Sequence, residues 1–220
     1  MDIIKIDLNN RESYQPAIEK AAGFLRKGGI VIFPTDTVCV LAASIFQLGA
    51  IRRIFKIKER PQSRPSPVLV KSIGMAENLA FVNDKTKKFL NKVWPGSVTI
   101  VLEKRDIISD ELISVQKTVG LRMPNCQFVL DLIKKTNEPL AATSVNLSGQ
   151  PSLNSSREIT VFLKGRSYWV DLMIDGGKLP EILPSTIIDL TREEPMVLRQ
   201  GPVKPKELLK IFNNLTQKYE

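Results

Sequence analysis

The chain has 220 residues, of which 43% are hydrophobic and 25% charged, a composition typical of one globular domain with a sizeable core. It contains no histidine and only two cysteines, which excludes Ser-His-Asp and Cys-His nucleophiles and makes a catalytic zinc site or a disulfide framework unexpected. The net charge of +9 predicts an anionic partner, and nucleic acid, a nucleotide or an acidic metabolite would each fit.

The N-terminal residues, MDIIKIDLNNRESY, lack the basic-then-apolar order of a secretory signal. No apolar run approaches the roughly 20 residues that cross a bilayer. We therefore expect a cytoplasmic protein without a membrane partner. A single domain over residues 1–220 is expected, because no repeat, low-complexity tract or linker interrupts the chain.

The first elements alternate between strand and helix patterns. Residues 3–8 alternate apolar and polar and predict a strand, and a helix follows with Ser13 as its cap and Pro16 in its first turn. Residues 30–33 are apolar and β-branched or aromatic, which predicts a buried strand. The Thr-Asp-Thr run at 35–37 therefore follows a strand end, where open α/β sheets place ligands, although such a run is also a common capping turn.

The next predicted helix, residues 49–58, ends in a lysine on its apolar face. Lys58 either extends to solvent or is directed into a cleft. The following loop, residues 59–67, has three prolines that restrict its shape, and it carries Arg60 and Arg64. Guanidinium groups on a rigid loop suit phosphate or carboxylate, which arginine binds by paired hydrogen bonds.

The middle of the chain continues the alternation. A strand at 68–70, a basic amphipathic helix at 84–93 and a strand at 98–102 are expected, and residues 103–117 are expected to be irregular. The lysines of the helix are most simply a solvated face. The next predicted strand, residues 118–124, has a polar face formed by Thr118, Gly120 and Arg122.

A helix capped by Asn125 leads to a strand at 140–142 and then to residues 143–149, which are rich in hydroxyl and amide groups. Such groups can receive phosphate, although a Ser/Asn-rich turn is the commoner meaning of such a run. The remaining pattern predicts strands at 170–174, 187–190 and 196–199 and a final helix from Pro205. We therefore expect an α/β fold with a mixed, twisted sheet flanked by helices.

Polar and cationic side chains recur at or beside the ends of the predicted strands. If they met around one open, concave, basic site, that site would suit phosphate-centred chemistry by positioning and charge stabilisation. Neither the P-loop nor the dinucleotide-binding fingerprint occurs. The members of this set are Thr37, Lys58, Arg60, Arg64, Thr118, Arg122, Ser144, Asn146, Ser185 and Arg199.

Eight blocks of this sequence resemble the YrdC-like family, the threonylcarbamoyl-AMP synthases of tRNA modification, in order and spacing. They are FPTDTV (33–38), KIKERP (56–61), WPGSVTIVL (94–102), VGLRMP (119–124), LAATSVNLSG (140–149), DGG (175–177), PSTIIDLT (184–191) and VLRQGP (197–202). The resemblance covers nearly the whole chain. The chain looks like the short form of the family, without the extra C-terminal domain of longer members.

The resemblance implies a reaction in which L-threonine and bicarbonate or CO2 form a carbamate. The carbamate attacks the α-phosphate of ATP, giving threonylcarbamoyl-AMP and pyrophosphate. Partner enzymes of tRNA modification then pass the threonylcarbamoyl group to an adenosine beside the anticodon, and direct RNA binding is left open. Mg2+ is expected with ATP, held mainly by phosphate oxygens, and no metal site of the protein's own is expected.

The resemblance also implies roles for individual residues. The threonine pocket would consist of Thr37, Arg122, Ser185 and the backbone near Ala142, with Arg122 pairing with the threonine carboxylate. Lys58 and Arg60 would be the catalytic pair that offsets charge developing on the phosphates. The ATP contacts would be Lys58, Arg60, Arg64, Thr118, Ser144, Asn146 and Arg199.

The sequence departs from the family pattern at three places. Cys39-Val40-Leu41-Ala42 stands where Tyr-Gly-Leu-Gly is usual, Ser66 replaces an apolar residue and Gln200 replaces a proline. A lost aromatic can remove a pocket wall, and valine does not easily adopt positive φ. The alternative is therefore an RNA-binding protein of tRNA or ribosome maturation with weak or lost catalysis, an interpretation that the +9 charge also favours.

Overall fold

The computed structural model describes residues 1–61, 65–113, 116–166 and 169–215. Arg64 lies outside the described residues. Within the described part of the chain, no helix has the length and apolar character needed to cross a membrane.

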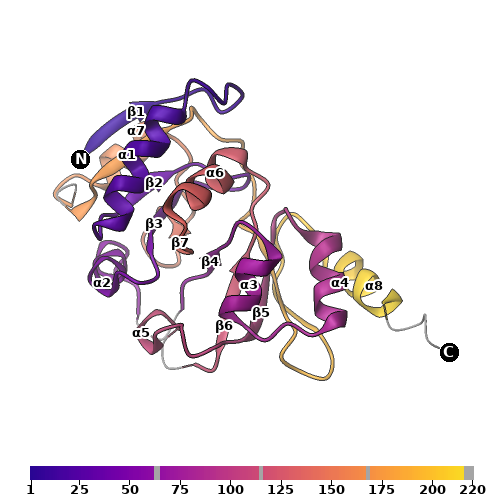
Figure 1. Ribbon diagram of the computed structural model, residues 1–220. Coiled ribbons are helices and arrows are strands. Elements are labelled where there is room, and N and C mark those ends of the chain that lie inside the picture. Colours follow the sequence, from indigo (N-terminus) through magenta and orange to yellow (C-terminus); the bar gives the residue numbers. More distant parts are fainter. Residues whose placement is uncertain (62–64, 114–115, 167–168, 216–220) are drawn as a thin grey trace.

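Over the described residues, ten strands form one mixed sheet, flanked by helices as the sequence predicts (Figure 1). Their spatial order is β1-β8-β2-β3-β7-β4-β6-β5-β9-β10. The strands are β1 (Asp2–Lys5), β2 (Val31–Phe33), β3 (Val40–Ser44), β4 (Val68–Leu69), β5 (Val98–Glu103), β6 (Thr118–Arg122), β7 (Leu140–Ser144), β8 (Leu172–Asp175), β9 (Thr186–Asp189) and β10 (Met196–Arg199). The helices are α1 (Gln15–Arg26), α2 (Leu48–Ile57), α3 (Ile73–Leu79), α4 (Asp84–Val93), α5 (Asp110–Ile113), α6 (Gln127–Thr136), α7 (Ser156–Phe162) and α8 (Pro205–Asn214).

The strand pairing joins segments that are far apart in the sequence. β2 and β3 pair antiparallel, β3 pairs antiparallel with β7, and β4 links β7 to β6. β5 then pairs antiparallel with β6 and parallel with β9, and β10 closes the order against β9. The sheet thus brings the end of β6, the start of β9 and the end of β10 into one half of the molecule.

Three apolar clusters cover the sheet. Helices α1 and α6 pack against each other over the β2–β3 region, and the apolar residues of α1, spaced at i, i+3, i+4 and i+7, are buried there. Helix α2 and α7 contribute to a second cluster. The third and largest cluster includes α3, α4 and α8, and the last two helices lie side by side at the end of the molecule opposite the N-terminus (Figure 1).

Several local predictions were wrong. Ser13 does not cap α1, because its hydroxyl donates to the main-chain oxygen of Asn10, and α6 begins after Cys126 without a side-chain cap from Asn125. Residues 103–117 are not wholly irregular, since they include α5. Helices α3 and α7 were not predicted; α7 carries a Ser155–Glu158 capping box, whose S-x-x-E pattern is visible in the sequence.

Candidate functional site

The connection between β2 and β3 binds a buried arginine at the end of β6. Arg122 donates from Nη1 to Thr37 Oγ1 at 2.9 Å and from Nη2 to Asp36 Oδ1 at 2.6 Å. Its Nε donates to the main-chain oxygen of Gly96 at 3.0 Å. Only 7% of the Arg122 side chain and 14% of that of Asp36 are exposed, so this ion pair lies in a poorly hydrated place. The two threonines of the loop also interact, with 3.1 Å between Thr35 Oγ1 and Thr37 Oγ1.

A second arginine is held at the neighbouring strands. Arg199, the last residue of β10, donates from Nε and Nη2 to the main-chain oxygen of Ser185, at 3.1 and 2.8 Å. The Ser185 hydroxyl lies 2.8 Å from that of Thr99 in β5. Gly201 allows this arrangement, because a Cβ there would lie 2.2 Å from the main-chain oxygen of Pro184.

The two arginines affect each other. Burial lowers the pKa of Arg122 from its ordinary value, although Asp36 opposes the shift. Burial, and after it the positive charge of Arg122, lowers the pKa of Arg199. Since arginine stays protonated in proteins, two guanidinium charges lie near each other in a partly desolvated place. An anion bound between them would be stabilised by charge-assisted hydrogen bonds.

Lys58 forms a separate hydrogen-bonded group with the end of β7. It directly follows α2, is only 1% exposed, and its Nζ donates to the main-chain oxygens of Ser144 and Asn146 and to Asn146 Oδ1. Asn146 Oδ1 also accepts from the Ser144 hydroxyl at 2.7 Å. Burial, and next the charge of Arg60, lowers the pKa of Lys58 to about 7, while its oxygen partners favour the protonated form. Lys58 therefore neither extends to solvent nor lies open in a cleft.

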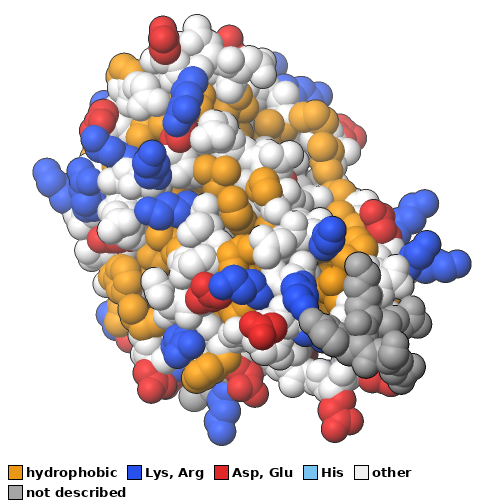
Figure 2. Space-filling view, turned by 45° about the vertical axis from the view of Figure 1, so that its right-hand side comes forward, with side chains coloured by type: hydrophobic (Ala, Val, Ile, Leu, Met, Phe, Trp, Pro, Cys, Tyr) orange, Lys and Arg blue, Asp and Glu red, His pale blue; other side chains and the backbone are white. Residues whose placement is uncertain are grey.

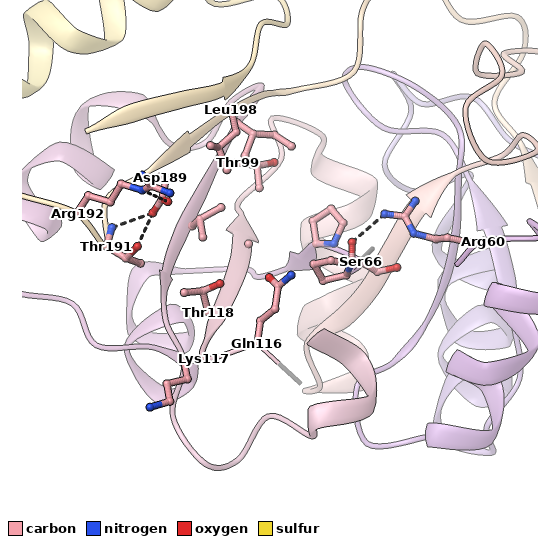
Figure 3. A pocket seen from close by; sticks show the side chains of 15 residues that line it. Arg60, Ser66, Thr99, Gln116, Lys117, Thr118, Asp189, Thr191, Arg192 and Leu198 are labelled. Atoms are coloured by element: carbon pink, nitrogen blue, oxygen red, sulfur yellow. Dashed lines mark hydrogen bonds and ion pairs between the residues drawn. The ribbon is translucent and has the colours of Figure 1, made fainter. Parts of the chain in front are cut away.

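A cavity of about 680 Å³ lies over β5, β6 and β9 (Figure 3). Arg60 stands at one end, where its Nη2 donates to the main-chain oxygen of Pro65 at 2.8 Å. Asp189 and Arg192 stand at the other end, and Thr118 lies between the two ends.

Two of these groups of residues are connected to the cavity through side chains that line it. Thr99 lines the cavity and binds the Ser185 hydroxyl, which connects the cavity to Arg199. Arg60 Nη1 lies 3.4 Å from the hydroxyl of Thr143, the residue before Ser144, which connects the cavity to the Lys58 group. Residues that the sequence separates by more than a hundred positions thus surround one hollow.

The structure brings most of the predicted site residues together, in three neighbouring groups. Thr37 and Arg122 form the first group, Ser185 and Arg199 the second, and Lys58, Ser144 and Asn146 the third, while Arg60 and Thr118 line the cavity. Ala142 lies in β7, where its N–H donates to the main-chain oxygen of Pro67 at 2.9 Å.

Sequence reasoning missed several residues of this site. Asp36 stood in the Thr-Asp-Thr run that the pattern singled out, but nothing nearby in the sequence marks it as the partner of Arg122. Thr99 and Asp189 lie inside apolar strand patterns, and only the cavity identifies them.

The side chains available here exclude some chemistry. Burial is the main cause that raises the pKa of Cys39 to about 12, so this thiol is not a thiolate nucleophile at neutral pH. Among the described residues, no three His, Cys, Asp or Glu side chains form a group that could hold a metal ion. The arrangement therefore suits binding of anions by cations and hydroxyl donors.

Comparison with known proteins agrees with this geometry. The Sua5/YciO/YrdC family model, described as "Telomere recombination", matches residues 23–201. A threonylcarbamoyl-AMP synthase of Pyrococcus abyssi is 34% identical over 212 residues, covering 96% of this chain and 62% of that protein. This chain therefore spans less than two thirds of the length of that relative.

Two solved structures are similar throughout the fold. Sua5 of P. abyssi, complexed with L-threonine, matches with a TM-score of 0.89 and 34% identity, over 96% of this chain and 61% of that one. YciO of Escherichia coli matches with a TM-score of 0.83 and 28% identity, over 94% of this chain and 98% of that one. The extent of the family match, together with these relatives, shows that the chain belongs to the Sua5/YciO/YrdC family.

Proposed function

We propose that this protein is a nucleotidyltransferase that forms threonylcarbamoyl-AMP and pyrophosphate from L-threonine, bicarbonate or CO2, and ATP. The synthase from Pyrococcus abyssi and the threonine complex of its Sua5 support this proposal. The observation that carries it is the buried guanidinium of Arg122 with the partly desolvated guanidinium of Arg199 near it, together with a cavity of about 680 Å³ that has Arg60 at its end. Two anionic substrates, a carboxylate and a triphosphate, are what such a set of cations would bind.

Arg122 would bind the threonine carboxylate. Three of its N–H groups donate to Gly96, Thr37 and Asp36, and a guanidinium has five. Ser185 and the backbone near Ala142 would complete the pocket. The amine of threonine, once deprotonated, adds to CO2 to give the carbamate, whose oxygen is the nucleophile for the next step.

The carbamate oxygen then attacks the α-phosphorus of ATP, and the bond from that phosphorus to the bridging oxygen of pyrophosphate breaks. Arg60 would stabilise the charge that develops on the phosphates, with Thr118 and Arg199 as further contacts. The Lys58–Ser144–Asn146 group would act together with Arg60, because Lys58 binds the loop after β7 through both its side chain and its main chain. Its Nζ binds this loop, and its main-chain oxygen accepts from Ser148 N at 3.0 Å.

Mg2+ would accompany ATP in this reaction. Among the described residues that line the cavity, Asp189 is the one carboxylate, and it already accepts from the N–H and hydroxyl of Thr191. This donor set fits an ion held mainly by phosphate oxygens, as is usual for Mg2+ bound with a nucleotide. The ion would offset phosphate charge at that end of the cavity.

The wider setting is also proposed. The protein would act in the cytoplasm as a single domain, and partner enzymes of tRNA modification would take the threonylcarbamoyl group from its product.

The test is release of pyrophosphate from ATP, measured with and without L-threonine and bicarbonate, together with detection of threonylcarbamoyl-AMP by mass spectrometry. Release that needs both additions supports the synthase. Release without threonine would indicate simple ATP hydrolysis. Absence of any threonine-dependent release and product would overturn the proposal and favour the alternative in which catalysis has been lost.

A further inference from the structure

The positive charge of this protein is concentrated on two helices away from the cavity. Figure 2 shows basic and acidic side chains interspersed over much of the face it presents, so a local excess must be identified from the residues themselves. Residues 84–93 and 204–214 contain seven lysines and two carboxylates, a surplus of five in a chain whose net charge is +9. About a tenth of the chain therefore carries more than half of its excess charge.

Three of the four lysines of α4 lie along one stripe. Lys85, Lys88 and Lys92 are spaced at i, i+3 and i+7, which places them on the same side of a helix. Phe89 and Leu90 are buried in the core, and Phe89 lies next to the stripe, one turn from Lys85. Lys88 and Lys92 are exposed, and Lys85 is half-buried.

Helix α8 adds a second group beside the first. Lys206 and Lys210 are one turn apart and exposed, and Lys204 precedes the helix. The two helices are in contact through Phe89 and Phe212, whose rings lie 5.4 Å apart at 80°. Lys85 Nζ lies 4.0 Å from the centre of the Phe212 ring, so a lysine of α4 reaches across to α8. We call the set Lys85, Lys88, Lys92, Lys204, Lys206 and Lys210 the lysine face.

Acidic side chains offset only part of this charge. Glu77 of α3 binds Lys87, which lies off the stripe, at 2.6 Å. Asp84 and Glu207 are exposed at the first turns of α4 and α8, where carboxylates also stabilise helix N-termini. Over residues 84–93 and 204–214, the six lysines of the face outnumber the two carboxylates, Asp84 and Glu207, so this part of the chain has a positive excess.

The composition of the face indicates its partner. Among the described residues, none of the exposed large hydrophobic side chains lies in α4 or α8. A protein interface usually has an apolar or aromatic centre, and an amphipathic membrane-binding helix needs an apolar face to insert. Binding to a phosphate backbone needs neither, because lysines displace the counterions of the nucleic acid.

We infer that the lysine face is a docking surface for the phosphate backbone of RNA. The choice of RNA among nucleic acids rests on the proposed function in tRNA modification, whereas the surface itself rests on its own charge. None of its lysines is among the described residues that line the cavity, so docking and catalysis would be separable. The face would hold the RNA near the enzyme without selecting its sequence, since backbone contacts carry no base information.

The experiment compares two triple variants that lose the same charge. One removes part of the face (Lys92→Ala, Lys206→Ala, Lys210→Ala), and the other removes exposed lysines elsewhere (Lys5→Ala, Lys27→Ala, Lys164→Ala). Binding of fluorescent tRNA is measured over a series of salt concentrations, and binding to vesicles of phosphatidylserine and phosphatidylcholine is measured in parallel. Thermal unfolding and threonine-dependent pyrophosphate release are recorded for each variant.

For the wild type we expect salt-sensitive RNA binding. The face variant should bind at least tenfold more weakly, with a plot of log affinity against log salt that is less steep by about 2, since each lost phosphate contact removes roughly 0.7–0.9 from the slope. The control variant should keep nearly the wild-type slope, and pyrophosphate release should be unchanged in both. Equal slopes in the two variants, no RNA binding by the wild type, or a loss confined to vesicle binding would each overturn the inference. None of these results would contradict the proposed synthase activity, which is tested separately by pyrophosphate release.

Discussion

The ammonium group of Lys58 binds Asn146 twice, at its main-chain oxygen (3.0 Å) and at its side-chain oxygen. This contact joins the end of α2 to the loop after β7, across 88 positions of sequence. A lysine that is 1% exposed can remain in such a place because oxygen acceptors compensate for part of its lost hydration.

The first prediction concerns the pH dependence of stability. The folded-state pKa of Lys58 is about 7, below its ordinary value of 10.5, so between these two pH values the unfolded chain binds more protons at this residue. The cost of burying Lys58 is therefore complete below pH 7, falls as pH rises and vanishes above 10.5. We expect Lys58→Met to remove a rise in the free energy of unfolding of about 3 kcal/mol between pH 7 and about pH 9.5.

Urea unfolding of the wild type and of Lys58→Met at several pH values measures this pH dependence. The other lysines contribute equally in both proteins, so their contribution cancels when the two free energies of unfolding are subtracted. The variant also leaves the acceptors of Lys58 buried without a partner, which lowers its stability by about 1–3 kcal/mol for each acceptor, equally at every pH. Parallel pH curves would show that the oxygen partners keep the pKa of Lys58 at its ordinary value.

The second prediction concerns Arg60. Arg60→Ala should reduce threonine-dependent pyrophosphate release by about 100-fold or more, because a positioned charge beside the developing phosphate charge is lost. Its hydrogen bonds to Pro65 and Thr143 are at the rim of the cavity, so unfolding should change by only about 1 kcal/mol. Arg60→Lys keeps the charge but loses the planar guanidinium, so its rate of pyrophosphate release should lie between those of the wild type and Arg60→Ala. Wild-type turnover in Arg60→Ala would remove this loop from the mechanism.

The third prediction concerns the ion pair between Asp36 and Arg122. Asp36→Asn should destabilise the fold by about 2–4 kcal/mol, because it leaves a buried guanidinium without its counter-charge. Asp2→Asn, which breaks an exposed pair with Lys20, is the matched control and should leave stability nearly unchanged, because solvent screens exposed ion pairs. Equal effects of the two substitutions in chemical denaturation would contradict the buried character of the Arg122 pair.

The fourth prediction compares two glycines. At Gly201 an added Cβ would lie 2.2 Å from Pro184 O and 2.5 Å from Thr186 N, and main-chain atoms of the sheet cannot move away cheaply. Gly201→Ala should therefore destabilise the protein by about 3 kcal/mol or more and weaken L-threonine binding through displacement of Ser185.

Gly23 supplies the control for this comparison. It lies inside α1 with nothing within 4 Å of an added Cβ, so Gly23→Ala should stabilise by about 0.5–1 kcal/mol and leave threonine binding unchanged. Thermal unfolding and calorimetric titration with L-threonine test both variants. If a folded Gly201→Ala variant binds L-threonine as tightly as the wild type, Ser185 does not belong to the threonine pocket.

Local pattern was sufficient where the physical cause is local. The apolar spacing of α1, α2 and α4 predicted their buried faces, and the apolar run at 30–33 predicted β2, because 3.6- and 2-residue periods record which side of an element faces the core. Cap residues were less well predicted: Ser13 and Asn125 had the right chemistry, but tertiary contacts placed the helix starts elsewhere.

By itself, the sequence determined the alternation of strands and helices, the cationic and hydroxyl side chains at the strand ends, and the absence of histidine chemistry. Only the tertiary structure decided that Arg122 pairs with Asp36, 86 positions away, that Thr99 meets Ser185, and that Lys58 is enclosed. The physical reason is that these partners are set by the order of strands in the sheet. That order depends on long-range packing of whole faces, which no window of neighbouring residues contains.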